Sequence, residues 1–369
     1  MDVRKKKLPI GIENFEDMMK EDFYYVDKTG LIADLLHNWG AVNLFTRPRR
    51  FGKSLNMSML EHFFSLNGDK SIFDGLEISK EASLCEEYMG KYPVLSISLK
   101  GIDAWNYEMA FEMAVQIMKR VPAKVQYLLE SDALSEQDKA EYCKLLDDNM
   151  SEAVFCNSLR VLSELLEKHH GAKVILLIDE YDVPLAKAHA NGYYDQMISL
   201  IRNLLGEALK TNNSLKLAVL TGCLRISKES IFTGLNNLKV LTIADERFDE
   251  YFGFTDKEVR ELLEYYDVAD HYDEVKRWYD GYQFGNAEVY CPWDVLNHCD
   301  RIRSESNVQP ENYWINTSSN DAVKRFIQES ANATTKREIE RLVAGEIIIK
   351  EIHQELTYPE IYQTIDNIW

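Results

Sequence analysis

The chain has 369 residues, of which 46% are hydrophobic and 28% charged, proportions typical of a globular protein with a buried core. Its formal net charge of −19 argues against non-specific nucleic-acid binding by the whole surface but leaves room for a local basic channel. The sequence lacks a bilayer-length apolar run and a signal-peptide core, and its six cysteines are scattered. These features exclude a membrane-spanning protein and predict a cytoplasmic protein with reduced thiols.

The N-terminal residues 1–40 are expected to form a lead-in that packs on the core. Asp27 is placed to cap a helix running from Lys28, because a short side-chain oxygen can accept hydrogen bonds from first-turn amides. The apolar run 41–46 then predicts a buried strand. Residues 55–64 predict a helix with one apolar face.

Three later apolar runs, 92–99, 174–178 and 215–220, also predict strands. The segments between them have helical character, for example 194–209. Because the strands lack polar alternation, the pattern predicts an α/β fold with a parallel sheet covered on both faces. The pattern of the sequence changes after Gly253, where we expect a domain boundary.

A candidate phosphate-binding loop lies between the first predicted strand and the helix that follows it. There, Gly52 would allow close approach of the backbone, Lys53 would reach phosphate oxygens, and Ser54 would ligate Mg²⁺. The usual G-x-x-x-x-G-K-[ST] pattern has a glycine where this chain has Arg47, so a basic turn is the alternative interpretation. The candidate cofactor-binding residues are Arg47, Pro48, Arg49, Arg50, Phe51, Gly52, Lys53, Ser54 and Leu55.

A pair of acids ends the strand predicted at 174–178. Asp179 is the candidate metal-side acid, together with Ser54, and Glu180 is the candidate general base that orients a water molecule. The alternative is a pair of solvated acids at a strand end. We interpret Asp182 as a cap of the next turn in preference to a metal ligand.

The strand predicted at 215–220 is followed by Thr221 and, shortly after, Arg225. Ligands collect at the carboxyl ends of parallel strands, so Thr221 is a candidate for orienting water and Arg225 for neutralising charge on phosphate. A turn threonine and a surface arginine are an equally weighted alternative.

Several basic and aromatic residues keep more than one interpretation. Arg47, Arg49 and Arg50 would contact phosphate, face a protein or DNA partner, or form structural ion pairs. The aromatic cluster 278–282 is interpreted as a packed corner in preference to a base-stacking surface. The candidates for contacts with a nucleotide base are Tyr24, Tyr25 and Lys28.

Five segments together, YYVDKT, TRPRRFGKS, LLIDEYD, WYDGYQF and YWINTSSND, resemble the AAA-ATPase-like family of bacterial and archaeal proteins. The resemblance runs from about Leu8 to Trp369. It implies a P-loop NTPase core with a three-layer parallel sheet, and a smaller helical or winged-helix-like module after it. It also implies that Lys53 and Ser54 are Walker A residues, that Asp179 and Glu180 are the Walker B pair, and that an arginine is usual at position 47.

Relatives in this family often continue into a restriction-endonuclease-like domain. This chain stops about where that continuation would begin, so we expect no nuclease domain within it. The expected organisation is a lead-in at 1–40, a P-loop ATPase domain at 41–253 and a C-terminal module at 254–369.

The leading functional hypothesis is a Mg²⁺-dependent ATP-binding protein, a slow ATPase whose nucleotide acts as a switch for the C-terminal module or a partner. The alternatives are a DNA- or protein-interaction module that uses the P-loop fold only as a scaffold, and the regulatory half of a nuclease system. A homo-oligomer stays open, and no membrane partner is expected.

Overall fold

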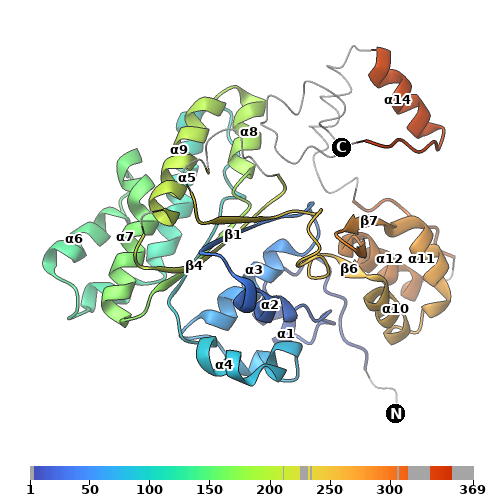
Figure 1. Cartoon of the computed structure of the whole chain (residues 1–369), viewed down its shortest axis with the longest axis horizontal. Helices are drawn as coiled ribbons and strands as arrows, with labels where there is room; N and C mark the ends of the chain where they lie inside the picture. Colours follow the sequence, from blue (N-terminus) through green and yellow to red (C-terminus); the bar gives the residue numbers. More distant parts are fainter. Residues whose placement is uncertain are drawn as a thin grey trace.

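A five-stranded parallel sheet forms the centre of the protein in a computed structural model that describes residues 4–210, 212–224, 232, 235–305, 307–314 and 333–350 (Figure 1). The strand order is β2-β3-β4-β1-β5, and all four neighbouring pairs are parallel. The carboxyl ends of all five strands therefore meet at one edge. The strands are β1 Val42–Thr46, β2 Val94–Ser98, β3 Val174–Asp179, β4 Leu215–Gly222 and β5 Leu238–Leu241.

Helices cover both faces of this sheet, and alternate strand residues face each layer. Along β1, Leu44 packs into one apolar cluster and Phe45 into the other; along β3, Leu176 and Leu177 divide in the same way. The strands carry apolar residues continuously because each face needs its own set. The prediction of a three-layer α/β fold with a parallel sheet is confirmed.

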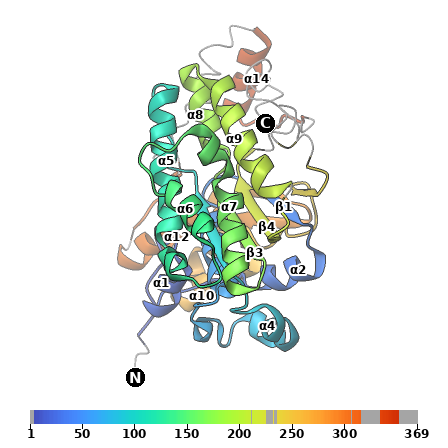
Figure 2. The same cartoon turned by 90° about the vertical axis from the view of Figure 1, so that its left-hand side faces the viewer.

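The first layer contains the long amphipathic helices between β2 and β4, which lie in front of the sheet in Figure 2. Its helices are α5 Tyr107–Ala123, α6 Glu136–Lys144, α7 Glu152–His170, α8 Val183–Asn191 and α9 Tyr194–Leu209. The second layer comes mainly from the N-terminal part of the chain. Its helices are α1 Phe15–Lys20, α2 Gly30–Asn38, α3 Lys53–Phe64 and α4 Ala82–Tyr88.

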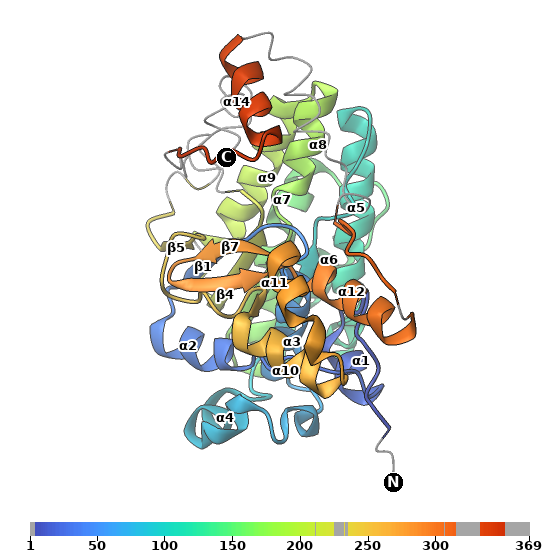
Figure 3. The ribbon, with the colours of Figure 1, turned by 90° about the vertical axis from the view of Figure 1, so that its right-hand side faces the viewer.

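A second, smaller sheet and three helices follow the core (Figure 3). We refer to residues 254–305 and 307–314 as the C-terminal module. It has an apolar cluster of its own that includes Val259, Leu262 and Val295. Its elements are β6 Phe254–Thr255, β7 Asp280–Phe284 and β8 Ala287–Tyr290, antiparallel in the order β6-β8-β7, with α10 Asp256–Tyr265, α11 Tyr272–Tyr279 and α12 Pro292–Ser304.

Residues 4–29, which we call the N-terminal segment, contact both the core and the C-terminal module. Phe15 packs in the second layer of the core, where its backbone N–H donates to the Ser58 hydroxyl at 2.9 Å. Leu8 and Val26 pack instead against the apolar cluster of the C-terminal module. The start of the chain therefore ties these two parts together.

The helix predicted from Lys28 begins two residues later, at Gly30. Asp27 is not its cap: one carboxylate oxygen accepts from the Thr29 backbone at 2.9 Å, and the other accepts from the Glu77 backbone at 2.7 Å. Asp27 therefore joins two segments of the second layer.

Four 3-10 helices and one further helix complete the described elements. They are the 3-10 helices Lys70–Phe73, Glu77–Lys80, Gln126–Glu130 and Ala269–His271, and the helix α14 Ala333–Val343. Within the described ranges, no helix combines the length and apolar character needed to cross a membrane.

Candidate nucleotide site

The loop between β1 and α3 turns sharply at the carboxyl edge of the sheet. Gly52 is the N-cap residue of α3 and has φ +79°, and Arg50 also has a positive φ, of +70°. A Cβ at position 52 would meet no atom within 4 Å, so glycine is favoured there by backbone conformation alone. This turn brings the first amides of α3, together with the positive end of its dipole, to the sheet edge.

The Lys53 side chain folds back over this loop. Its ammonium donates to the carbonyl oxygens of Arg47, at 3.0 Å, and Pro48, at 2.8 Å, and the residue is only 5% exposed. The lysine therefore closes the loop on itself. The two carbonyl oxygens accept hydrogen bonds from the Lys53 ammonium, and phosphate oxygens could accept the same hydrogen bonds.

Asp179, at the end of β3, joins the loop to the neighbouring strand β4. One of its carboxylate oxygens accepts from the Ser54 hydroxyl at 2.7 Å, and the other accepts from the Thr221 hydroxyl. The residue is 8% exposed. The parallel register explains the proximity, since Phe45 of β1 lies beside Thr221 and β4 lies beside β3.

Glu180 lies one residue further out and lines the cavity in front of the loop. Its φ is +52°, a left-handed conformation that is uncommon for a residue with a side chain. Burial raises the pKa of the Glu180 carboxyl, and the negative charge of Asp179 raises it further. Backbone strain of this kind occurs often at functional sites.

Asp182 is buried and has a structural role. Its carboxylate accepts from the backbone N–H groups of Cys223, at 2.8 Å, and Leu224, at 3.1 Å. Burial raises the pKa of Asp182. The residue occupies the N-cap position of α8 but makes no capping hydrogen bond there, so our interpretation of it as a cap is wrong. It fastens the turn after β4.

The side chain of Arg47 points away from the cavity into the protein interior. Its guanidinium donates to the carbonyls of Leu241, at 3.0 Å, and Phe248, at 3.2 Å, and lies 5.0 Å from the centre of the Phe252 ring. Burial lowers the pKa of Arg47 to about 10. The structure thus gives this side chain a structural role in place of the predicted contact with phosphate. Pro48 contributes its carbonyl oxygen as an acceptor for the Lys53 ammonium.

The other predicted loop residues lie around the cavity. Arg49 and Leu55 line it, and Phe51 is buried against Tyr282 of β7, with ring centres 4.9 Å apart. The guanidinium of Arg50 lies 4.1 Å from the ring centre of Trp293, in α12. The loop therefore contacts the C-terminal module through two of its residues. Arg225 lies outside the described residues.

The cavity has a volume of about 380 Å³ and opens between the core, the N-terminal segment and the C-terminal module. Six basic and two acidic side chains line it, although the whole chain is strongly acidic. Three of these cations are ion-paired, Lys28 with Glu258, Lys100 with Glu13 and Lys187 with Asp103, so the positive charge that suits an anionic ligand lies mainly in the loop. The charged lining residues are Glu13, Lys28, Arg49, Arg50, Lys53, Lys100, Glu180 and Lys187.

Some residues that line the cavity were not predicted from the sequence. Lys100, Lys187 and Trp293 lie on segments far apart in the chain, and only the fold brings them to one cavity. For Trp293, a signal was available: Pro292 directly before it is typical of the first position of a helix, and that places the tryptophan at a helix start.

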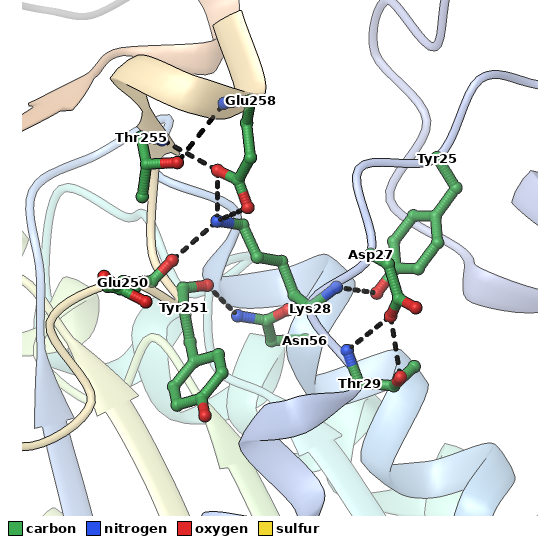
Figure 4. A network of polar contacts seen from close by, with 9 residues as sticks. All are labelled: Tyr25, Asp27, Lys28, Thr29, Asn56, Glu250, Tyr251, Thr255 and Glu258. Atoms are coloured by element: carbon green, nitrogen blue, oxygen red, sulfur yellow. Dashed lines mark hydrogen bonds and ion pairs between the residues drawn. The ribbon is translucent and has the colours of Figure 1, made fainter. Parts of the chain in front are cut away.

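The predicted base contacts line the cavity but are held by protein partners, which Figure 4 shows for Tyr25 and Lys28. The Lys28 ammonium lies 2.6 Å from both carboxylate oxygens of Glu258 and from the Glu250 carbonyl. Burial lowers the pKa of Lys28. The Tyr25 hydroxyl accepts from the Lys28 backbone at 3.2 Å, and the Tyr24 ring packs 4.7 Å from that of Tyr265.

Two comparisons relate the chain to known proteins. The model of a family described as "Predicted AAA-ATPase" matches residues 9–232. The chain is also 30% identical over 297 residues to a protein of Azotobacter chroococcum mcd 1 described as "Uncharacterized protein in vnfD 5'region". That match covers 79% of this chain and 51% of the relative, so the chain spans about half the length of the curated relative that it matches.

Proposed function

Because the chain belongs to the AAA-ATPase-like family, we propose that it binds ATP with Mg²⁺ at the loop between β1 and α3 and hydrolyses it slowly. In this proposal the bound nucleotide is a switch for the C-terminal module or for a partner. The observation that carries it is the 2.7 Å hydrogen bond from Ser54 to Asp179, residues 125 positions apart. It joins the end of the loop to the acidic end of a neighbouring strand.

Ser54 and Asp179 fit the coordination preferences of Mg²⁺, which takes oxygen ligands and combines one or two carboxylates with phosphate oxygens and water. Among the described residues, no group of three or more His, Cys, Asp or Glu side chains could hold a metal by itself. An ion here would therefore depend on the phosphates. When bound, it would neutralise charge on the transferred phosphoryl group.

The other loop residues have distinct parts in the proposal. The Lys53 ammonium would exchange the carbonyls of Arg47 and Pro48 for phosphate oxygens, and the first amides of α3 would receive the same phosphates. Glu180 would orient the attacking water and accept its proton. Thr221 would hold Asp179 in place through its hydroxyl.

The alternative of a DNA-binding arginine surface receives less support. Arg47 is buried in the interior, and Arg50 lies over Trp293. The division into a lead-in at 1–40, an ATPase domain at 41–253 and a module at 254–369 remains our proposal, as does the switch role.

The direct test is ATP binding followed by calorimetry in the presence of Mg²⁺. Lys53→Ala should abolish binding, because it removes the only side chain of the loop that both lines the cavity and holds the loop carbonyls. Lys124→Ala is the matched control, since that lysine is 67% exposed and pairs with Glu61 on the surface. Equal ATP affinity of Lys53→Ala and the wild type would contradict the proposed site.

A further inference from the structure

The lining of the cavity is chemically mixed. The loop contributes cationic side chains, as described above. The N-terminal segment contributes Pro9, Ile12 and Val26, and the C-terminal module contributes Phe254 and Leu296. A ligand that fits this lining has an anionic part and an apolar part.

Trp293, in the C-terminal module, lies beside the loop between β1 and α3. Its ring centre is 4.1 Å from the guanidinium carbon of Arg50 in the loop, and its indole N–H donates to the Tyr313 carbonyl at 3.3 Å. The hydrogen bond fixes the ring's orientation, and the contact with Arg50 fixes its distance from the loop. Trp293 is partly buried and lines the cavity.

The tyrosines predicted as base contacts are less suited to this task. Tyr24 packs on Tyr265 and Tyr266 of the module, and the Tyr25 hydroxyl donates to the Met59 sulfur at 3.4 Å. Both side chains are therefore held within the walls of the cavity. Trp293 offers the larger aromatic surface beside the loop.

We infer that the base of the nucleotide binds in this cavity in contact with Trp293, which makes the C-terminal module part of the nucleotide site. This inference rests on the proposed function. Aromatic side chains hold bases by stacking whatever the base, because every base has a π-face. A bound nucleotide would thus touch the core through its phosphates and the module through its base.

The test separates the two ends of the ligand by comparing ATP with inorganic tripolyphosphate, each titrated with Mg²⁺ by calorimetry. Trp293→Ala should weaken ATP binding by about tenfold or more, in line with the loss of one base–aromatic contact, and leave tripolyphosphate binding unchanged. Trp293→Phe keeps an aromatic ring and should retain most of the ATP affinity. Trp278→Ala is the matched control, because this tryptophan of the same module is 51% exposed and lies outside the cavity lining.

The other outcomes are distinguishable. If Trp293→Ala binds ATP as the wild type does, the inference is wrong and the proposed function stands. If the variant loses ATP and tripolyphosphate equally, Trp293 supports the loop or the fold and the inference is wrong as well. If the wild type binds neither ligand, the proposed function fails and the inference fails with it. Thermal unfolding of each variant identifies a general loss of structure.

Discussion

The ammonium group of Lys28 and the carboxylate of Glu258 form a buried ion pair at 2.6 Å, joining the N-terminal segment to the first turn of α10. The Glu258 carboxylate also accepts from the Thr255 backbone at 2.7 Å and so completes a capping box at the start of this helix. One carboxylate therefore starts a helix and anchors a segment from the other end of the chain. The Lys28 side of the pair lines the candidate nucleotide cavity.

Removing the lysine of this pair should destabilise the fold. Lys28→Met leaves the Glu258 carboxylate, only 20% exposed, without its cation, and such changes cost about 3 kcal/mol of unfolding free energy. Lys7→Met is the control, because its pair with Glu21 is at least half exposed and should contribute less than about 1 kcal/mol. Urea unfolding measures both. Similar losses of unfolding free energy for the two variants would show that the Lys28 pair contributes no more to stability than the exposed pair.

Two arginines of the loop should separate stability from ligand binding. Arg47→Ala removes a buried guanidinium from two carbonyl groups and should lower the unfolding free energy by at least about 2 kcal/mol. Arg49→Ala removes a cavity-lining cation and should weaken ATP binding with little change in stability. Thermal unfolding and calorimetry on both variants check this. If Arg47→Ala instead weakened ATP binding with little change in stability, Arg47 would belong to the ligand site.

The hydroxyl of Ser54 should matter only when the metal is present. Ser54→Ala should weaken ATP binding in the presence of Mg²⁺ by about tenfold and have little effect in EDTA, since the hydroxyl is proposed to reach the ligand through the ion. Ser65→Ala, at the other end of α3, is the control. A loss of affinity that is the same with and without Mg²⁺ would argue against metal ligation by Ser54.

Glu180→Gln should keep ATP binding and lose turnover, because the amide preserves the shape of the side chain but cannot accept a proton from water. Phosphate release, measured under saturating ATP, is the relevant quantity. Glu13→Gln is a suitable control, since Glu13 also lines the cavity but lies in the N-terminal segment. Turnover by Glu180→Gln at the wild-type rate would remove Glu180 from the role of base.

The acid dependence of stability should include a contribution from Asp256. Burial alone would raise the pKa of this carboxyl, but hydrogen bonds from Tyr272, Arg260 and Tyr290 hold it below its usual range. A lowered folded-state pKa gives stability that is present above the unfolded value of about 3.9 and is lost as pH falls toward the folded value. The difference in unfolding free energy between wild type and Asp256→Asn should therefore be larger at pH 7 than at pH 3. A pH-independent difference would contradict this account.

The sequence predicted those features that depend on local pattern. Continuous apolar strands alternating with helices indicated a parallel sheet, and the polar residues after two of them indicated a site at its carboxyl edge. The structure brings Ser54, Asp179 and Thr221 together there. The helix after the loop begins at Lys53, two residues earlier than the expected apolar face suggested. Gly52, the N-cap residue with its positive φ, lets the chain turn directly from the loop into the helix, which explains the earlier start.

Features that depend on where a side chain points in the folded protein could not be predicted from the sequence. The segment R-P-R-R does not indicate which arginine side chain points into the interior. Arg47 does so because its guanidinium can donate hydrogen bonds to carbonyl groups of β5 and of a later loop. The proposed role of Trp293 depends on how α12 packs beside the loop between β1 and α3. Lys28 is similar: its partner lies 230 positions later, so no local pattern connects them.

The double attachment of the N-terminal segment also sets an order of events during synthesis. Leu8, Ile10 and Val26 leave the ribosome first, yet the cluster that they complete includes Val295 and Ile302. These early residues cannot reach their final positions until some 270 more have been made, and contacts this distant in sequence form late and slowly. The contacts of the first residues with this cluster therefore form only after most of the chain has been made, and Val26 also lines the candidate nucleotide cavity.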